Sequence, residues 1–327
     1  MIVETGKASR KLVIFGLKLT ITCGCFWYVL RQVAFQEIFR EAISLDRSWF
    51  AAAVVTMATQ IPLVALRWTW ITNALEPQHR PVPLRAMIAI SFIANFLSQA
   101  LPNLMGDAMR VWMLSRIGSG WRVGLVGVVI DRGVGIGTLL AIGFVTLLHP
   151  STFTQFGGYR RALLLIFGAL LLSAVIVLTG ARLLMPLLTH YRATRWMSEF
   201  IVASRRVLIE SPAAILVVAT ALIIHLLSIV AIWELGQAFA MSLGVEAAAV
   251  LFTLMVAAAI VPVSVSGWGL REMMVTAFLT AHGMPAQRAL LFSISFGLTL
   301  ILASTPGAVV MMFYSPGKAR RTPPTTI

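Results

Sequence analysis

The sequence predicts an all-α polytopic membrane protein, with six spanning helices plus two oppositely oriented re-entrant helical hairpins in an inverted repeat. Of its 327 residues, 59% are hydrophobic and 12% are charged, whereas soluble domains have roughly 45–50% and about 25%. Several apolar stretches reach the roughly 20 residues that a spanning helix needs. Two further stretches are interrupted near their middle by related proline and glycine motifs.

The apolar stretches place the elements along the chain. No signal-peptidase site follows the first stretch, so we expect it to remain as a membrane anchor. The stretch 84–117 is cut by Pro102, and the stretch 247–283 is cut by Pro262 and Gly267. Each predicts a hairpin that enters and leaves on one side, although kinks in longer helices are the alternative. The predicted spans lie near 11–30, 49–75, 124–148, 161–179, 213–239 and 287–313.

Lysine and arginine in the loops predict the orientation. With a cytoplasmic N-terminus, the inner loops hold 15 basic residues and the outer loops hold 6, as the positive-inside rule requires. Both termini are then cytoplasmic, and the two hairpins enter from opposite sides. We therefore predict one transmembrane domain over 1–313, with repeats at about 49–148 and 213–313, and a cytoplasmic tail at 314–327. Opposed repeats of this kind are common in secondary transporters.

Composition and motifs argue against several other functions. The net charge of +14 comes from basic residues dispersed through loops rather than from a stripe, so we expect no nucleic-acid partner. Cys23 and Cys25 lie in the first apolar stretch and indicate neither a disulfide framework nor a metal site. No HExxH, GxSxG or Walker A string occurs, so we expect neither an enzyme nor an ATP-driven pump, and no cofactor.

The interrupted stretches carry two related strings, LPNLMGDAMR at 101–110 and VPVSVSGWGLR at 261–271. Both read proline, three or four residues, glycine, three residues, arginine. Irregular backbone is tolerated at membrane depth only where protein or a water-filled cavity satisfies it. Breaks at corresponding positions of two halves therefore predict a transport site.

Charged residues within the membrane segments point to the same place. Lys18 can extend to the interface, and Arg67, beside Trp68 and Trp70, is interpreted as an interfacial anchor. The remaining ionised side chains each cost about 2.5–3.5 kcal/mol at the bilayer centre, so we expect them to face a polar interior and one another. They are Arg110, Arg132, Arg271, Asp107, Asp131, Glu272 and Glu234.

Two interpretations of these charges are open. They could be structural ion pairs, with Asp107 and Arg110 paired at i and i+3. Arg271 and Glu272 are adjacent and do not face one another on a helix, so one of them would pair across the site. Alternatively, the arginines bind an anionic ligand, best a phosphate that a planar guanidinium grips with two hydrogen bonds. The predicted site comprises Arg110, Arg271, Arg132, Asp107, Glu272, Asp131, Gly106, Gly267, Pro102 and Pro262.

Two other segments carry weaker patterns. Residues 181–211 place Trp196, Phe200 and Val207 at near-helical spacing among arginines, which is typical of an amphipathic helix on the anionic inner leaflet or of an ordinary basic loop helix. The glycines of the string DRGVGIG at 131–137 predict a close helix-packing face.

At these motifs the chain resembles the lysylphosphatidylglycerol synthase transmembrane, flippase-like family, which includes the membrane domain of the multiple peptide resistance factor. VPVSVSGWGLRE at 261–272 is similar to the family signature Pro-x-Ser-x-x-Gly-x-Gly-x-Arg-Glu. Pro102, Gly106-Asp107, Arg110 and Asp131-Arg132 match its other conserved positions, over about residues 10–313. Met105 stands where relatives often have a second glycine, and the soluble synthase domain is missing.

The resemblance implies an inner-membrane lipid transporter of the bacterial cell without the synthase activity. Its cargo would be a phosphate-bearing, otherwise anionic or aminoacylated lipid headgroup. Expected partners are a membrane phospholipid or polyprenyl-phosphate lipid, with a lipid-biosynthesis enzyme and a second copy in a homodimer as candidates. The rival is a non-transporting membrane accessory that anchors or presents lipid to an envelope, hopanoid or glycolipid biosynthesis enzyme. A carrier of soluble substrates comes third.

Overall fold

The computed structural model describes residues 45–76, 81–100, 104–148, 157–181, 190, 195–260 and 269–314. The chain divides into two compact units. Unit 1 comprises 1–57, 98–103 and 229–303, and unit 2 comprises 58–97, 104–228 and 304–327. The division passes through four of the described helices, at 57/58, 97/98, 228/229 and 303/304.

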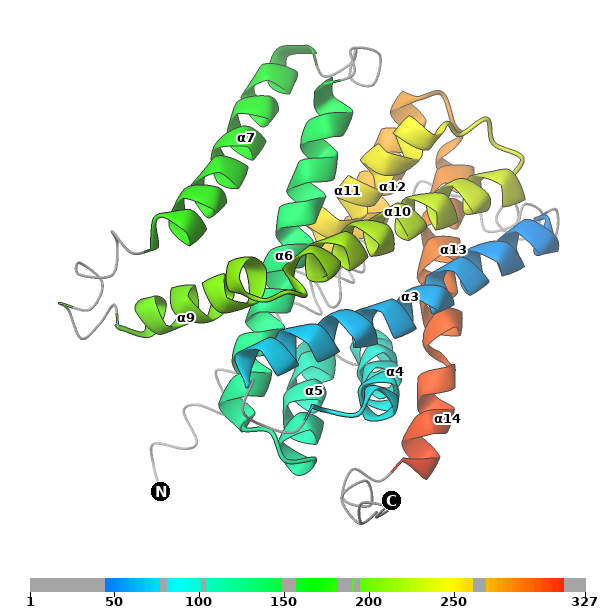
Figure 1. Cartoon of the computed structure of the whole chain (residues 1–327). Helices are drawn as coiled ribbons and strands as arrows, with labels where there is room; N and C mark the ends of the chain where they lie inside the picture. The colour runs from blue at the N-terminus through cyan, green and yellow to red at the C-terminus, as the bar shows by residue number, and fades with distance from the viewer. Residues whose placement is uncertain are drawn as a thin grey trace, which may run out of the picture. The chain divides into compact units, whose positions relative to one another are not determined.

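The described residues are helical, and they contain no strand, which confirms the all-α class (Figure 1). Most of the helices are strongly apolar. An apolar segment in lipid forms a helix because a helix satisfies every backbone N–H and C=O group within the segment itself. The elements are α3 (Arg47–Leu75), α4 (Leu84–Ala100), α5 (Leu104–Arg116), α6 (Trp121–Leu148), α7 (Gly157–Thr179), α9 (Arg195–Arg205), the π-helix η2 (Arg206–Glu210), α10 (Ala214–Ala238), α11 (Val245–Ile260), α12 (Leu270–Ala281), α13 (Ala286–Ser304) and α14 (Pro306–Phe313).

Five helical segments of the described chain are long and apolar enough to cross a membrane. They match five of the six predicted spans to within three residues at either end. The last segment is made of α13 and α14, which meet at Thr305 and Pro306. The predicted span at 11–30 lies outside the described residues. The protein is thus a multi-pass membrane protein.

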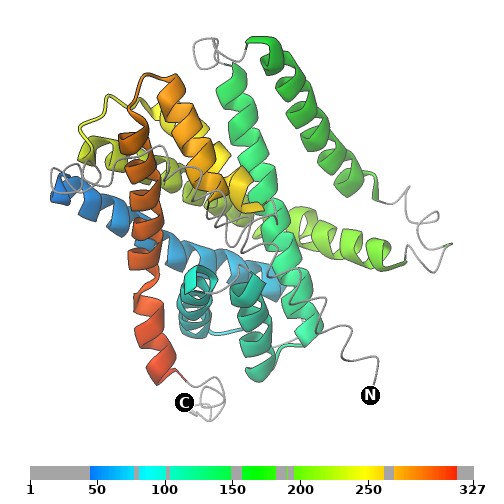
Figure 2. The same ribbon diagram turned by 180° about the vertical axis from the view of Figure 1, so that it is seen from behind.

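The two interrupted stretches each form a pair of short helices. Figure 2 shows α4 and α5 side by side, and both contribute to the same buried cluster in unit 2. The helices α11 and α12 contact each other in unit 1. The first pair is described up to Ala100 and again from Leu104, and the second up to Ile260 and again from Gly269. Because Pro102, Pro262 and Gly267 lie outside the described residues, the re-entrant course of each pair stays a prediction.

In unit 2, two clusters of buried apolar residues join the helices that carry the first motif. One centres on Trp68 of α3, which is fully buried, and joins α3, α4, α5 and α6. The other joins α3, α6, η2 and α10 around Val207. Phe200 packs against this second cluster, while Trp196 is exposed. The apolar side chains of the helical segment 195–210 are therefore covered by protein only in part.

Glycines allow close helix contacts in unit 2, but at other places than predicted. A Cβ at Gly307 of α14 would lie 2.1 Å from the carbonyl oxygen of Phe92 in α4, so a side chain there would push the two helices apart. At Gly133, Gly135 and Gly137 an added Cβ would meet nothing within 4 Å. Among the described residues, these three glycines therefore do not permit a close helix contact as predicted, although the carbonyl oxygen of Gly135 lies 2.9 Å from Nε2 of His225 on α10.

Labelling tests the re-entrant course of the first helix pair. If 84–117 enters and leaves on one side, cysteines at Gln78 and Ser119 should react with a membrane-impermeant maleimide from the same face. The measurement uses a background in which Cys23 and Cys25 are replaced by serine. Labelling from opposite faces would contradict both the hairpin and the inverted repeat.

Candidate functional site

Asp131 is the centre of a buried ion network in unit 2. It lies on α6 with 5% of its surface exposed. Its Oδ1 accepts a hydrogen bond of 2.7 Å from Nε of Arg67 on α3, and its Oδ2 lies 3.5 Å from Nη1 of Arg110 on α5. One carboxylate therefore holds two guanidinium groups from two other helices. Each unpaired charge would carry a desolvation cost of several kcal/mol.

Arg110 is only partly satisfied by this network. It is 9% exposed, and its guanidinium carbon lies 5.7 Å from the centre of the Trp68 ring, a cation–π distance. Its Nε has no hydrogen-bond partner among the described residues. The indole N–H of Trp68, also buried, lacks one too. Two buried N–H donors in neighbouring side chains thus lack an acceptor among the described residues. Buried donors without a partner are rare in native structures.

A second pair lies beside the first, because Asp107 precedes Arg110 by about one turn on α5 and Arg132 directly follows Asp131 on α6. Nε and Nη2 of Arg132 donate to Oδ2 of Asp107 over 3.1 and 2.8 Å. Asp107 is in the first turn of α5, where the helix dipole favours a carboxylate. The Arg132 side chain is 56% exposed and that of Asp107 only 12%.

The described network carries an excess of positive charge. Three arginines, Arg67, Arg110 and Arg132, share the two carboxylates of Asp107 and Asp131. With all groups ionised, the set has a net charge of about +1. Burial of a net cation is unfavourable, so the network is electrostatically suited to an added anion.

The second motif forms a charge-balanced site in unit 1. Gly269, with φ of 84°, precedes α12, and its N–H donates over 2.6 Å to Oε2 of Glu272. Oε1 of Glu272 accepts from Nε and Nη2 of Arg271 over 2.9 and 2.5 Å. Glu272 is fully buried and Arg271 is 6% exposed. The guanidinium also lies 5.9 Å from the ring centre of Phe296.

Three interpretations of individual residues require correction. Arg67 is not an interfacial anchor, because it is buried and bound to Asp131. Asp107 binds Arg132 of α6 rather than Arg110, and Nη1 of Arg110 lies 3.5 Å from Asp131 instead. Arg271 and Glu272 bind each other directly, because Glu272 bends back to the start of α12, where the neighbouring arginine also reaches.

The structure brings part of the predicted site together. Gly106, Asp107, Arg110, Asp131 and Arg132 belong to unit 2, where Gly106 is buried in the first turn of α5. Arg271 and Glu272 belong to unit 1, so a shared site of the two motifs stays a prediction. Pro102, Pro262 and Gly267 lie outside the described residues. The sequence interpretation missed Arg67, although an aspartate inside the apolar segment of α6 was a signal for an additional cation.

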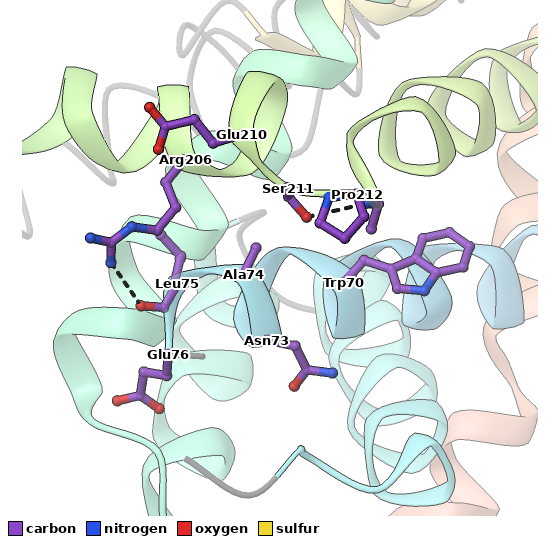
Figure 3. A pocket seen from close by; sticks show the side chains of 10 residues that line it. Trp70, Asn73, Ala74, Leu75, Glu76, Arg206, Glu210, Ser211 and Pro212 are labelled. Atoms are coloured by element: carbon purple, nitrogen blue, oxygen red, sulfur yellow. Dashed lines mark hydrogen bonds between the residues drawn. The ribbon is translucent and has the colours of Figure 1, made fainter. Parts of the chain in front are cut away.

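Unit 2 also contains a pocket of about 800 Å³ at the end of α3, away from the residues of the ion network. Figure 3 shows Trp70, Asn73 and Glu76 on one side and Arg206 and Glu210 on the other. Nη1 of Arg206 lies 3.5 Å from the carbonyl oxygen of Leu75. Charges of both signs therefore line the pocket, beside a π-helix, an element frequent at functional sites.

Matched substitutions test the ion network. Asp131→Asn should destabilise the protein by about 3–5 kcal/mol, because it leaves two buried guanidinium groups without a counter-charge. Asp107→Asn should cost less than about 1 kcal/mol, because Arg132 is half exposed and can be solvated. The measurement is reversible unfolding of the purified protein in detergent. Equal losses for both variants would contradict the central role of Asp131.

The comparisons with known proteins agree with the motifs. A search of curated proteins finds no match to this chain. The family model for the lysylphosphatidylglycerol synthase TM region matches residues 14–307, which include both motifs and all of the ion-network residues. The chain therefore belongs to the lysylphosphatidylglycerol synthase TM region family.

Proposed function

We propose that this protein is a flippase-like lipid transporter of the bacterial inner membrane. The headgroup would cross through the polar site formed by the two motifs, while the acyl tails stay in the bilayer. The cargo is a lipid whose headgroup carries a phosphate or another anionic group, including an aminoacylated one. No synthase activity is proposed, and both termini are placed in the cytoplasm.

The observation that carries the proposal is the unbalanced charge around Asp131. A purely structural network is most stable when each buried charge has its partner. Here Arg67 and Arg110 share one carboxylate, and Nε of Arg110 has no partner among the described residues. An anion bound at Arg110 would neutralise the excess charge and accept this hydrogen bond.

The chemistry of arginine favours a phosphate as that anion. Its guanidinium presents N–H groups in a fixed fork that matches two phosphate oxygens, and it stays charged at physiological pH. Asp131 keeps Arg110 paired when the site is empty. A long contact of 3.5 Å is easier to give up than the 2.7 Å bond that holds Arg67. In this proposal, Arg67 holds Asp131 in place and Arg110 exchanges between Asp131 and the ligand.

The second motif would contribute Arg271 from unit 1. Its guanidinium is held by Glu272, and Glu272 in turn is held by the N–H of Gly269 and by α13, where Ser293 Oγ lies 3.5 Å from Oε1. This support fixes the arginine at the start of α12. A fixed guanidinium loses little freedom when it binds a ligand, which favours affinity.

The rival function is a membrane accessory that anchors or presents lipid to a biosynthetic enzyme. Such a protein needs a stable, paired core but no site that releases its ligand. The balanced pair of Arg271 and Glu272 would fit it. The excess charge and the unpartnered donors at Arg110 and Trp68 favour a ligand site, and with it the transporter.

Charge-conserving substitutions separate ligand binding from folding. Arg110→Lys and Arg271→Lys should each lower lipid translocation by about tenfold or more, because lysine keeps the charge but loses the two-point grip, and one charged hydrogen bond is worth about 1.5–3 kcal/mol. The ion pairs should largely survive. Translocation is measured with purified protein in liposomes that contain a fluorescent anionic phospholipid, and thermal stability is measured alongside.

Arg288→Lys is the matched control, because Arg288 donates to the carbonyl oxygen of Phe239 and belongs to neither motif. It should translocate lipid like the wild type. Wild-type rates for a stable Arg110→Lys and a stable Arg271→Lys would show that both arginines are structural. Absence of any translocation by the wild-type protein would instead favour the accessory.

A further inference from the structure

Glu234 is the one deep carboxylate of the described helices that has no basic partner. It lies on α10, which is otherwise almost entirely apolar, one turn before the helix ends at Ala238. Asp107, Asp131 and Glu272 are each bound to an arginine. Glu234 belongs to unit 1 and is half-buried. It therefore requires a different explanation from the other acidic residues.

The hydrogen bonds of Glu234 are incomplete. Oε1 accepts a hydrogen bond of 3.1 Å from Oγ1 of Thr56 on α3. Oε2 is buried and has no hydrogen-bond partner among the described residues. The carboxyl group thus has one neutral donor and no counter-charge. An ionised carboxylate can accept about four hydrogen bonds, and the described residues around Glu234 provide one donor.

The surrounding charges do not supply a partner either. Arg271 is bound to Glu272, and Arg288 donates to the carbonyl oxygen of Phe239. Glu234 forms no ion pair within the described part of unit 1. The other ionisable side chains described in that unit are Asp46, Arg47, Glu246, Arg271, Glu272, His282 and Arg288.

An ionised group in this position is costly. An ionised carboxylate without a counter-charge is unfavourable in apolar surroundings, and buried acids avoid this cost by taking up a proton. Protonation makes the Glu234 carboxyl group neutral and removes this cost. The bond from Thr56 keeps the ionised form accessible, because a hydroxyl donor favours a carboxylate.

We propose that Glu234 is a proton-binding site that takes up a proton in apolar surroundings and releases it when water reaches the carboxyl group. The site consists of the Glu234 carboxyl group and the Thr56 hydroxyl, and it joins α10 to α3 within unit 1. This assignment is independent of lipid transport. Its use to couple lipid movement to a proton gradient rests on the proposed function.

Carbodiimide labelling tests the proton site. N,N′-dicyclohexylcarbodiimide reacts with protonated carboxyl groups in apolar surroundings, and mass spectrometry locates the product. Wild-type protein in liposomes should be labelled at Glu234 at pH 7, and the label should fall at least fivefold when the pH is raised to 9.5. Glu234→Gln should lose this label and serves as the peptide control.

Two carboxylates of the same unit are internal controls. Glu272, bound to Arg271, and Glu246, exposed at the start of α11, should both stay at least fivefold less labelled than Glu234. Labelling of Glu234 that does not exceed these two, or that does not fall as the pH rises, would overturn the proposal.

A pH gradient across the same liposomes tests the coupling. A gradient of one unit should change wild-type lipid translocation by up to tenfold, and Glu234→Gln should remove this response. Labelled but gradient-insensitive protein would overturn the coupling and leave the proton site established. Labelled protein without any translocation would overturn the proposed function and the coupling together, while the proton site would stand.

Discussion

The arrangement of unit 2 depends on the requirement that a buried charge has a counter-charge. Asp131 lies inside an apolar helix, and it cannot stay ionised there without a cation at hydrogen-bond distance. Arg67 and Arg110 meet this requirement from α3 and α5. The same three helices, together with α4, form the cluster around Trp68. Apolar packing brings the helices together without direction, whereas the ion pairs select the rotation of each helix about its axis.

The two motifs use the same residue types in different electrostatic states. In unit 1, Arg271 and Glu272 balance each other, and the carboxylate also binds the N–H that begins α12. In unit 2, the arginine of the motif depends on a carboxylate that another arginine already holds more tightly. The first motif is therefore the one that gains stabilisation from an added anion. The second is already satisfied, so its arginine is a fixed contact.

The sequence predicted the helices well and the partners poorly. Helix positions follow from the length of apolar runs, because a membrane requires each run to satisfy its own backbone, and five predicted spans agree with the structure. Partners depend on which face of a helix meets which neighbour, and this is a property of three-dimensional packing. Arg67 illustrates the difference. Its neighbouring tryptophans suggested an interface, but Trp68 is fully buried.

Two rules based on spacing along the sequence also gave wrong contacts, one for the neighbouring residues Arg271 and Glu272 and one for the glycines of α6. The rule that adjacent residues do not face each other applies to the middle of a helix. At the first turn of α12, the Glu272 side chain bends back to the backbone of Gly269, and the adjacent Arg271 side chain is long enough to follow. A Cβ added at Gly133, Gly135 or Gly137 of α6 would meet no described atom within 4 Å, although the spacing of these glycines is typical of a contact face.

The acidic residues of the membrane helices fall into two kinds, according to whether the carboxylate binds an arginine or a hydroxyl group. Asp107, Asp131 and Glu272 each bind an arginine and hold it in place. An acid that faces only a hydroxyl can exist in both protonation states, because neither state is fixed by a neighbouring charge. Glu234 belongs to this second kind. In the proposed transporter, the first kind of acid keeps the anion site formed when it is empty, and the second exchanges a proton with its surroundings.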